Sequence, residues 1–144
     1  MRWTEADFDG MSWHDNHVHG MDLRAGDHDE GELQLDLDHI LEWVKGTDGC
    51  VAFRLTPAVL CFNAVSGLRV TIDFAGSSAA VGPFSIGQIE RIVETGVRSS
   101  KPAWRILLNW PKGEICFRAS GFHQWLTGEI RVCDRQVLDP HERS

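Results

Sequence analysis

Long apolar runs are missing from this sequence of 144 residues. A membrane-spanning helix needs roughly 18 consecutive apolar residues, and no stretch of the chain approaches that length. The opening segment, MRWTEADFDG, is polar and acidic, whereas a secretory signal peptide has a basic start followed by an apolar stretch. These two absences predict a cytoplasmic protein that makes no contact with a membrane.

Cysteine is scarce and widely spaced, at positions 50, 61, 116 and 133. The chain has no C-x-x-C pair, which excludes a zinc ribbon and a thioredoxin-type redox motif. Cys61, Cys116 and Cys133 lie in apolar segments, where a reduced thiol packs like a small hydrophobic side chain. A Cys–His catalytic pair assembled in space remains open, although no neighbouring residue in the sequence predicts a lowered thiol pKa.

Basic residues are few as well, because 14 Lys and Arg stand against 21 Asp and Glu, for a net charge of −7. Nucleic-acid binding depends chiefly on Lys and Arg contacts to phosphate, so this balance argues against it. It suits a basic protein partner. Catalytic signatures such as G-x-S-x-G, a P-loop, G-x-G-x-x-G and H-E-x-x-H do not occur either, so the sequence indicates no reaction and no cofactor.

What the chain does contain is a series of short alternating segments. Leu33, Leu35 and Leu37 alternate with polar residues, and segments 68–74 and 104–110 repeat the pattern. Alternation of period two is typical of a strand with one face buried. Further apolar runs, separated by Gly, Pro, Asn or Asp, lie at 51–55, 59–64, 114–119, 123–126 and 129–133. Because the connections are too short for parallel crossovers, we expect an all-β or β-dominated α+β fold, mainly an antiparallel sheet or sandwich.

The chain length predicts a single β-rich domain over residues 1–138, with a core that needs neither disulfides nor a structural metal. Residues 139–144 are charged and are predicted to form a flexible C-terminal tail. One segment, 85–95, departs from the strand pattern. Ser85 can cap a helix, apolar residues recur at positions 86, 89, 92 and 93, and Gly96 can end it. We predict one short helix near 85–95, with a bulged strand as the alternative.

Histidine and acidic residues are concentrated near the N-terminus, where five of the seven histidines lie between residues 13 and 43. His17 and His19 would share one face of a strand, a spacing found in metal sites. The other candidate ligands in this segment are His14, Asp15, Asp36 and Asp38.

Strand pairing tests whether these ligands can meet. If residues 17–23 pair with residues 33–37, matching the apolar faces puts both histidines beside the leucines and Asp36 and Asp38 on the opposite side. The sheet would then separate the two best ligand pairs unless a bulge at Gly20 intervenes. We therefore expect no metal and histidines hydrogen-bonded within the fold. The alternative is a metal-binding or metal-dependent hydrolytic site built from His14, His17, His19, Asp36 and Asp38.

Tyrosine is absent, but there are six tryptophans. Trp13 and Trp43 flank the acidic segment that carries Asp36 and Asp38. Aromatic side chains are enriched in protein interfaces, and charge complementarity selects the partner. These four residues are the predicted surface for a basic protein partner.

Three motifs carry a resemblance that spans most of the chain. They are W-H-D-x-x-[IV]-H at 13–19, G-E-L-x-L-D-[IL]-D-x-I-x-E-W at 31–43 and N-W-P-x-G-E-I-x-F-x-A-x-G-F at 109–122. In these motifs the chain resembles a family of small bacterial proteins of unknown function. The resemblance implies that the chain is a member of that family, and it implies no enzymatic reaction. In size, acidity and β content it is also similar to the immunity proteins of bacterial toxin systems. The sequence thus favours a non-enzymatic protein–protein interaction module, and leaves a homo-oligomer open.

Overall fold

The computed structural model describes residues 1–76, 81–93 and 101–143, and in these ranges β-strand is the main secondary structure. The strands are β1 (Arg2–Thr4), β2 (His17–Ala25), β3 (Gly31–Lys45), β4 (Val51–Ile72), β5 (Phe84–Ile92), β6 (Ala103–Trp110), β7 (Gly113–Arg118), β8 (Gly121–Leu126) and β9 (Arg131–Cys133). Two short 3-10 helices, η1 (Glu5–Gly10) and η2 (Pro140–Glu142), complete the described elements. No helix in the described ranges is long and apolar enough to cross a membrane.

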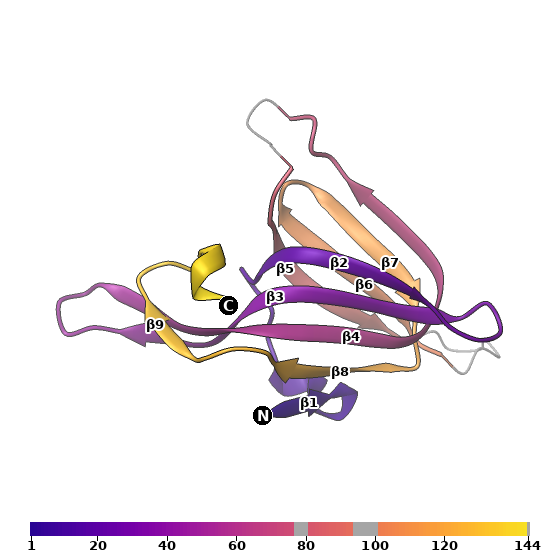
Figure 1. Cartoon of the computed structure of the whole chain (residues 1–144), viewed down its shortest axis with the longest axis horizontal. Helices are drawn as coiled ribbons and strands as arrows, with labels where there is room; N and C mark the ends of the chain where they lie inside the picture. Colours follow the sequence, from indigo (N-terminus) through magenta and orange to yellow (C-terminus); the bar gives the residue numbers. More distant parts are fainter. Residues whose placement is uncertain (77–80, 94–100, 144) are drawn as a thin grey trace.

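All strand pairs are antiparallel, so the predicted β-dominated antiparallel fold is confirmed. The 22-residue strand β4 organises the sheet. One edge of β4 pairs with β3. The other edge pairs first with β9, then with β8 and then with β7 along the length of β4. Because β3, β2, β5, β6 and β7 also follow one another as neighbours, the sheet closes on itself. Two layers result, with β2, β3, β4 and β8 in front of β5, β6 and β7 (Figure 1).

The main core lies between these layers. Leu33, Leu35 and Leu37 are fully buried, as their alternation predicts, and an aromatic group of Phe62, Trp104 and other rings fills the centre. A second, smaller cluster joins Ile40, Phe53, Leu55 and Leu138. It supports the β3–β4 hairpin where that hairpin projects beyond the two layers (Figure 1).

The predicted helix near 85–95 is wrong over the described residues, because Phe84–Ile92 is strand β5. Residues 94 and 95 lie outside the described ranges. Ile86 and Ile89 are both buried although they are three positions apart, a spacing that mimics a helix. The register of β5 against β6 shifts around Ile86 and Gln88, and the extra residue returns both isoleucines to the same face. The bulged-strand alternative is what the chain adopts.

The residues predicted to form a flexible C-terminal tail make contacts in the structure. Pro140–Glu142 form η2, and Arg143, which follows it, contacts the carboxylates of Asp36 and Asp38. Just before η2, Leu138 is buried in the second cluster. Residues 139–143 are thus held by side-chain contacts, and Ser144 lies outside the described residues.

Candidate functional site

A bulge in β2 decides how the N-terminal histidines lie. His17 pairs with Asp38 and Val18 with Leu37, but the next pair is Gly20 with Asp36, so His19 is an extra residue. It sits on the side of the sheet opposite the leucines, with its Nε2 atom 2.7 Å from Asp38 Oδ2. The predicted separation of the histidines from Asp36 and Asp38 is therefore wrong. Unbroken alternation predicts the separation, and a bulge next to Gly20, the exception that the sequence left open, reverses it.

Asp38 is the centre of this arrangement, and its side chain is fully buried. Its Oδ2 atom accepts hydrogen bonds from His19 Nε2–H and from the backbone N–H of Leu138, at 2.7 and 2.8 Å. Its Oδ1 atom accepts from Arg143, whose guanidinium also contacts Asp36. A buried carboxylate is stable only when paired and hydrogen-bonded, and here both oxygens have partners.

His19 is a neutral donor in this network. Burial lowers the pKa of its imidazole, and the positive charge of Arg143 lowers the pKa further. Its Nε2–H donates to Asp38, whose negative charge Arg143 already balances. His19 therefore orients the Asp38 carboxylate, which in turn bonds to Leu138 and Arg143 of the C-terminal segment. Transfer of the His19 Nε2 proton would break the hydrogen bond to Asp38.

His39 and Asn16 form a second buried pair on the other face of β3. Asn16 Nδ2 donates to His39 Nδ1 at 2.9 Å, and the backbone N–H of Ile40 donates to Asn16 Oδ1 at 3.2 Å. Burial lowers the pKa of His39 to about 4, so its ring is neutral at pH 7. The Trp3 ring packs edge-on against His39 with the ring centroids 5.3 Å apart.

The two other candidate histidines bond to the backbone. His14 Nδ1–H donates to the Gly87 carbonyl oxygen at 3.0 Å, and 59% of the His14 side chain is exposed. His17 Nδ1–H donates to the Asp15 carbonyl oxygen at 3.1 Å, and burial lowers the pKa of His17. Both interactions match the expectation of histidines hydrogen-bonded within the fold.

Asp15 connects three parts of the chain. It precedes β2 with a φ of 64°, and its carboxylate accepts from Asn109 Nδ2 at 2.7 Å and Gln136 Nε2 at 3.0 Å. Asn109 belongs to β6 and Gln136 to the C-terminal segment. The acidic side chain therefore ties the start of β2 to segments about a hundred residues away.

These contacts bear directly on the metal alternative. The structure brings His19, Asp36 and Asp38 together, but around the Arg143 guanidinium, which a cation would have to displace. His14 and His17 direct one ring nitrogen each to a carbonyl oxygen. The described ligand atoms of these residues do not converge on one point.

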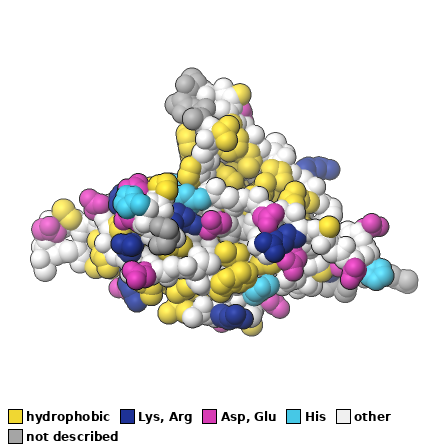
Figure 2. Space-filling view, viewed as in Figure 1, with side chains coloured by type: hydrophobic (Ala, Val, Ile, Leu, Met, Phe, Trp, Pro, Cys, Tyr) yellow, Lys and Arg dark blue, Asp and Glu magenta, His cyan; other side chains and the backbone are white. Residues whose placement is uncertain are grey.

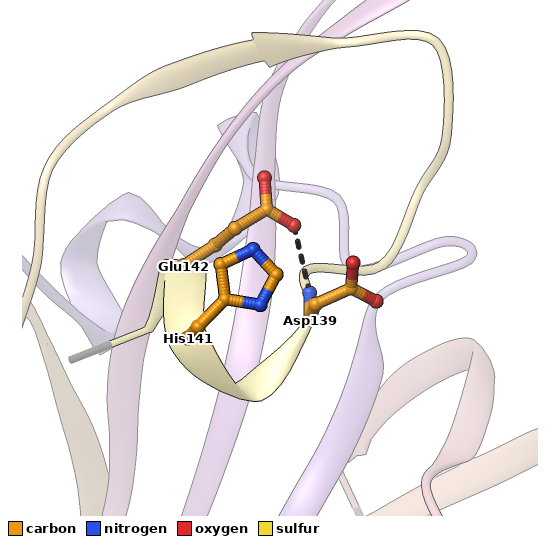
Figure 3. A group of neighbouring side chains, drawn as sticks. All are labelled: Asp139, His141 and Glu142. Carbon is orange, nitrogen blue, oxygen red and sulfur yellow. Dashed lines mark hydrogen bonds between the residues drawn. The ribbon is translucent and has the colours of Figure 1, made fainter.

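One other group of candidate ligand atoms does converge, in and beside η2. Single ligand atoms of Asp139, His141 and Glu142 lie within 4.8 Å of one another. Figure 3 shows the three side chains together. Glu142 also accepts the backbone N–H of Asp139 at 2.9 Å and pairs with Arg135 at 2.7 Å. This is the geometry of a capped 3-10 turn on the surface, and it already uses the Glu142 carboxylate.

The Cys–His combination that remained open occurs at Cys61 and His123, which face each other on β4 and β8. Cys61 is 1% exposed, and burial raises the pKa of its thiol to about 11. Asn63 Nδ2 donates to His123 Nδ1 at 3.2 Å. A nucleophilic cysteine needs a lowered thiol pKa, so this environment suppresses the thiolate.

The predicted partner surface needs two corrections. Trp13 is 3% exposed and lies in the main core, where its Nε1–H donates to Gln124 Oε1 at 2.8 Å. Asp38 is buried under the C-terminal segment. Neither can contact a partner. Asp36 and Trp43 are exposed, but they stand seven residues apart on β3, roughly 23 Å at about 3.3 Å per residue.

A feature that the sequence did not reveal is the free edge of β2, residues Gly20–Ala25. β2 pairs with β5 only through His17 and Val18, so these exposed residues have β3 on one edge and no described strand on the other. Met21 and Leu23 are 38% and 58% exposed there. Alternation predicted both side chains on the same face as the buried leucines of β3. They are exposed because no described strand pairs with this part of β2 on its other edge.

Acidic side chains lie on the opposite face of the same hairpin. Asp22 and Asp36 are 58% and 51% exposed, and Glu32 is exposed as well. Figure 2 shows this side of the molecule, with acidic and basic side chains side by side over β2 and β3 and hydrophobic ones over β4 and β8. No family model, curated protein or solved structure matches the chain.

Proposed function

We propose that the protein is a non-enzymatic interaction domain that binds a basic protein partner along the β2–β3 hairpin. The observation that carries the proposal is the free edge of β2, which presents unpaired backbone groups beside a row of carboxylates. An unpaired strand edge is a template for a strand from another chain. Natural domains usually shield such edges, so a long exposed one points to a partner.

The chemistry on each side of this edge defines the partner. A strand added to β2 would cover Met21 and Leu23 with apolar side chains on its inner face. On its outer face it would meet Asp22, which pairs with Arg24 of the same strand at 2.9 Å, with Glu32 and Asp36 one strand further away. Lys or Arg at alternate positions of the partner strand would complement these carboxylates, and the net charge of −7 would speed the encounter.

The internal use of the reactive groups supports a binding role over catalysis. Asp38 and His19 hold the C-terminal segment, and the Cys61 thiol has a raised pKa. An immunity-like protein that neutralises a basic toxin is one case of this proposal, in keeping with the acidity and β content of the chain.

The test is a capture experiment with variants that leave the Arg143 contacts intact. Leu23→Lys puts a charge on the free edge, and Asp22→Lys reverses the charge beside it. The control is Val132→Lys, because Val132 is 66% exposed on β9. We expect both hairpin variants to lose proteins that the wild type captures from cells of its source, with unchanged melting temperatures, and the control to retain them. Equal capture by all four proteins would contradict the proposal.

A further inference from the structure

A separate pocket lies toward the other end of β3, away from the free edge of β2. Its volume is about 420 Å³, within the range of small-ligand sites. Its lining includes Trp3, His14, His39, Glu42 and Trp43. None of these residues belongs to the hairpin surface that the proposed function uses.

Two indole rings form walls that are held in place before any ligand arrives. Trp3 packs against the buried ring of His39, with centroids 5.3 Å apart. Trp43 is 53% exposed and packs against Phe53, with centroids 5.0 Å apart. A large exposed tryptophan that is braced on one side offers its other side to a ligand at little entropic cost.

The charge of the pocket is negative. Glu42 is the only Lys, Arg, Asp or Glu among the residues that line it. One Glu42 carboxylate oxygen lies 3.5 Å from Arg54 Nη1, and the other has no hydrogen-bond partner in the described part of the chain. Both of these side chains are largely exposed, so the contact is weak and can be shared or replaced.

Burial removes the charge of one of the two histidines in the lining. His39 is neutral at pH 7 because burial lowers its pKa to about 4, and its Nδ1 accepts from Asn16. His14 directs Nδ1–H to the Gly87 carbonyl oxygen, and its Nε2 lies 3.5 Å from a carboxylate oxygen of Asp15. Aromatic faces and a carboxylate oxygen are the groups that bind a flat donor of positive charge.

We propose that this pocket binds a guanidinium group, as carried by an arginine side chain. A guanidinium stacks on an indole face while its N–H groups donate to a carboxylate, and it gives up its hydration more readily than an ammonium group. The proposal rests on the proposed function only for the source of the arginine, which would be the basic partner. Binding of the group itself needs no partner.

The experiment measures binding of Nα-acetyl-L-arginine amide to the whole protein by ligand-observed saturation-transfer NMR. We expect saturable binding, with the citrulline analogue, which is neutral and of the same shape, binding at least about tenfold more weakly. Glu42→Gln should weaken binding of the arginine compound by roughly tenfold, and Trp43→Leu should also weaken it. Added salt should reduce the wild-type affinity.

Two matched controls are available in the chain. Glu129→Gln removes a carboxylate that is 87% exposed and loosely paired with an arginine, as Glu42 is. Trp110→Leu removes a tryptophan that is 47% exposed and does not line the pocket. Both should bind the arginine compound as the wild type does.

Three outcomes would overturn the inference: no saturable binding, equal binding of the citrulline analogue, or equal loss in the control variants. The result is independent of the capture experiment, which changes Leu23 and Asp22 and leaves the pocket intact. Binding of the arginine compound without hairpin-dependent capture would support the guanidinium site and contradict the proposed function. Hairpin-dependent capture without binding of the arginine compound would support the proposed function and contradict the guanidinium site.

Discussion

At the scale of single residues, the contacts of Asp38 set its contribution to stability. Asp38→Asn keeps the shape of the side chain but removes the charge that Arg143 compensates. Breaking a buried ion pair leaves the other charge without a partner, so we expect a loss of about 3 kcal/mol in the free energy of unfolding, measured by urea denaturation. Asp36→Asn is the control, because Asp36 is half exposed and should cost less than about 1 kcal/mol. Equal costs at the two positions would contradict the assignment of Asp38 as the centre.

His39 predicts how stability depends on pH. Its folded pKa is about 4 and its usual value is 6.5, so between these values the unfolded chain binds the proton that the folded chain excludes. Stability is therefore complete above pH 6.5 and declines as the pH falls toward 4, by roughly 3 kcal/mol from this group. The lowered pKa values of His17 and His19 act in the same direction.

Urea unfolding near pH 7.5 and near pH 5 measures this decline. His39→Asn retains an acceptor for Asn16 and cannot be protonated in this range, so the variant should lose less stability in acid than the wild type. An equally steep decline in the variant would show that other groups cause it.

At the scale of elements, we expect the C-terminal segment that carries η2 to contribute to the stability of the fold. Deleting residues 139–144 removes Arg143 and leaves the buried Asp38 carboxylate without its cation. We expect a loss comparable to that of Asp38→Asn, whereas a frayed tail would cost nothing.

A double-mutant cycle separates this explanation from general loosening of the surface. In the Asp38→Asn background the deletion should cost much less than in the wild type, because the pair is already broken. Additive losses would mean that the deleted residues act through other contacts, such as that of Glu142 with Arg135.

At the scale of the whole molecule, the strands could be predicted because alternation is local. Leu33, Leu35 and Leu37 identified the buried face of β3 without knowledge of any partner strand. The bulges at His19 and near Ile86 were open as alternatives, but alternation could not decide for them, since one extra residue changes no composition but reverses every face that follows it. The same errors misplaced the candidate site, because His19 was assigned to the wrong side of the sheet.

The long-range contacts could not be predicted from the sequence either. Asp38 is paired with a residue near the other end of the sequence, and nothing local to it distinguishes a buried carboxylate from a solvated one. The exposure of Met21 and Leu23 depends on a neighbour strand that is missing over the described residues. Burial of Trp13 depends on rings contributed by distant segments, such as Phe122.

The closure of the sheet on β4 has a consequence for the speed of folding. β4 collects its neighbours from both sides of the sequence, and β1 pairs with β8 across nearly the whole chain. The chain loses the entropy of closing large loops before such pairs form their contacts. Domains with many of these pairings fold slowly, in times on the order of milliseconds to seconds. Among the described strands that follow one another in the sequence, β3 and β4 form the longest pairing, so their hairpin is the natural first structure on which the remaining strands assemble.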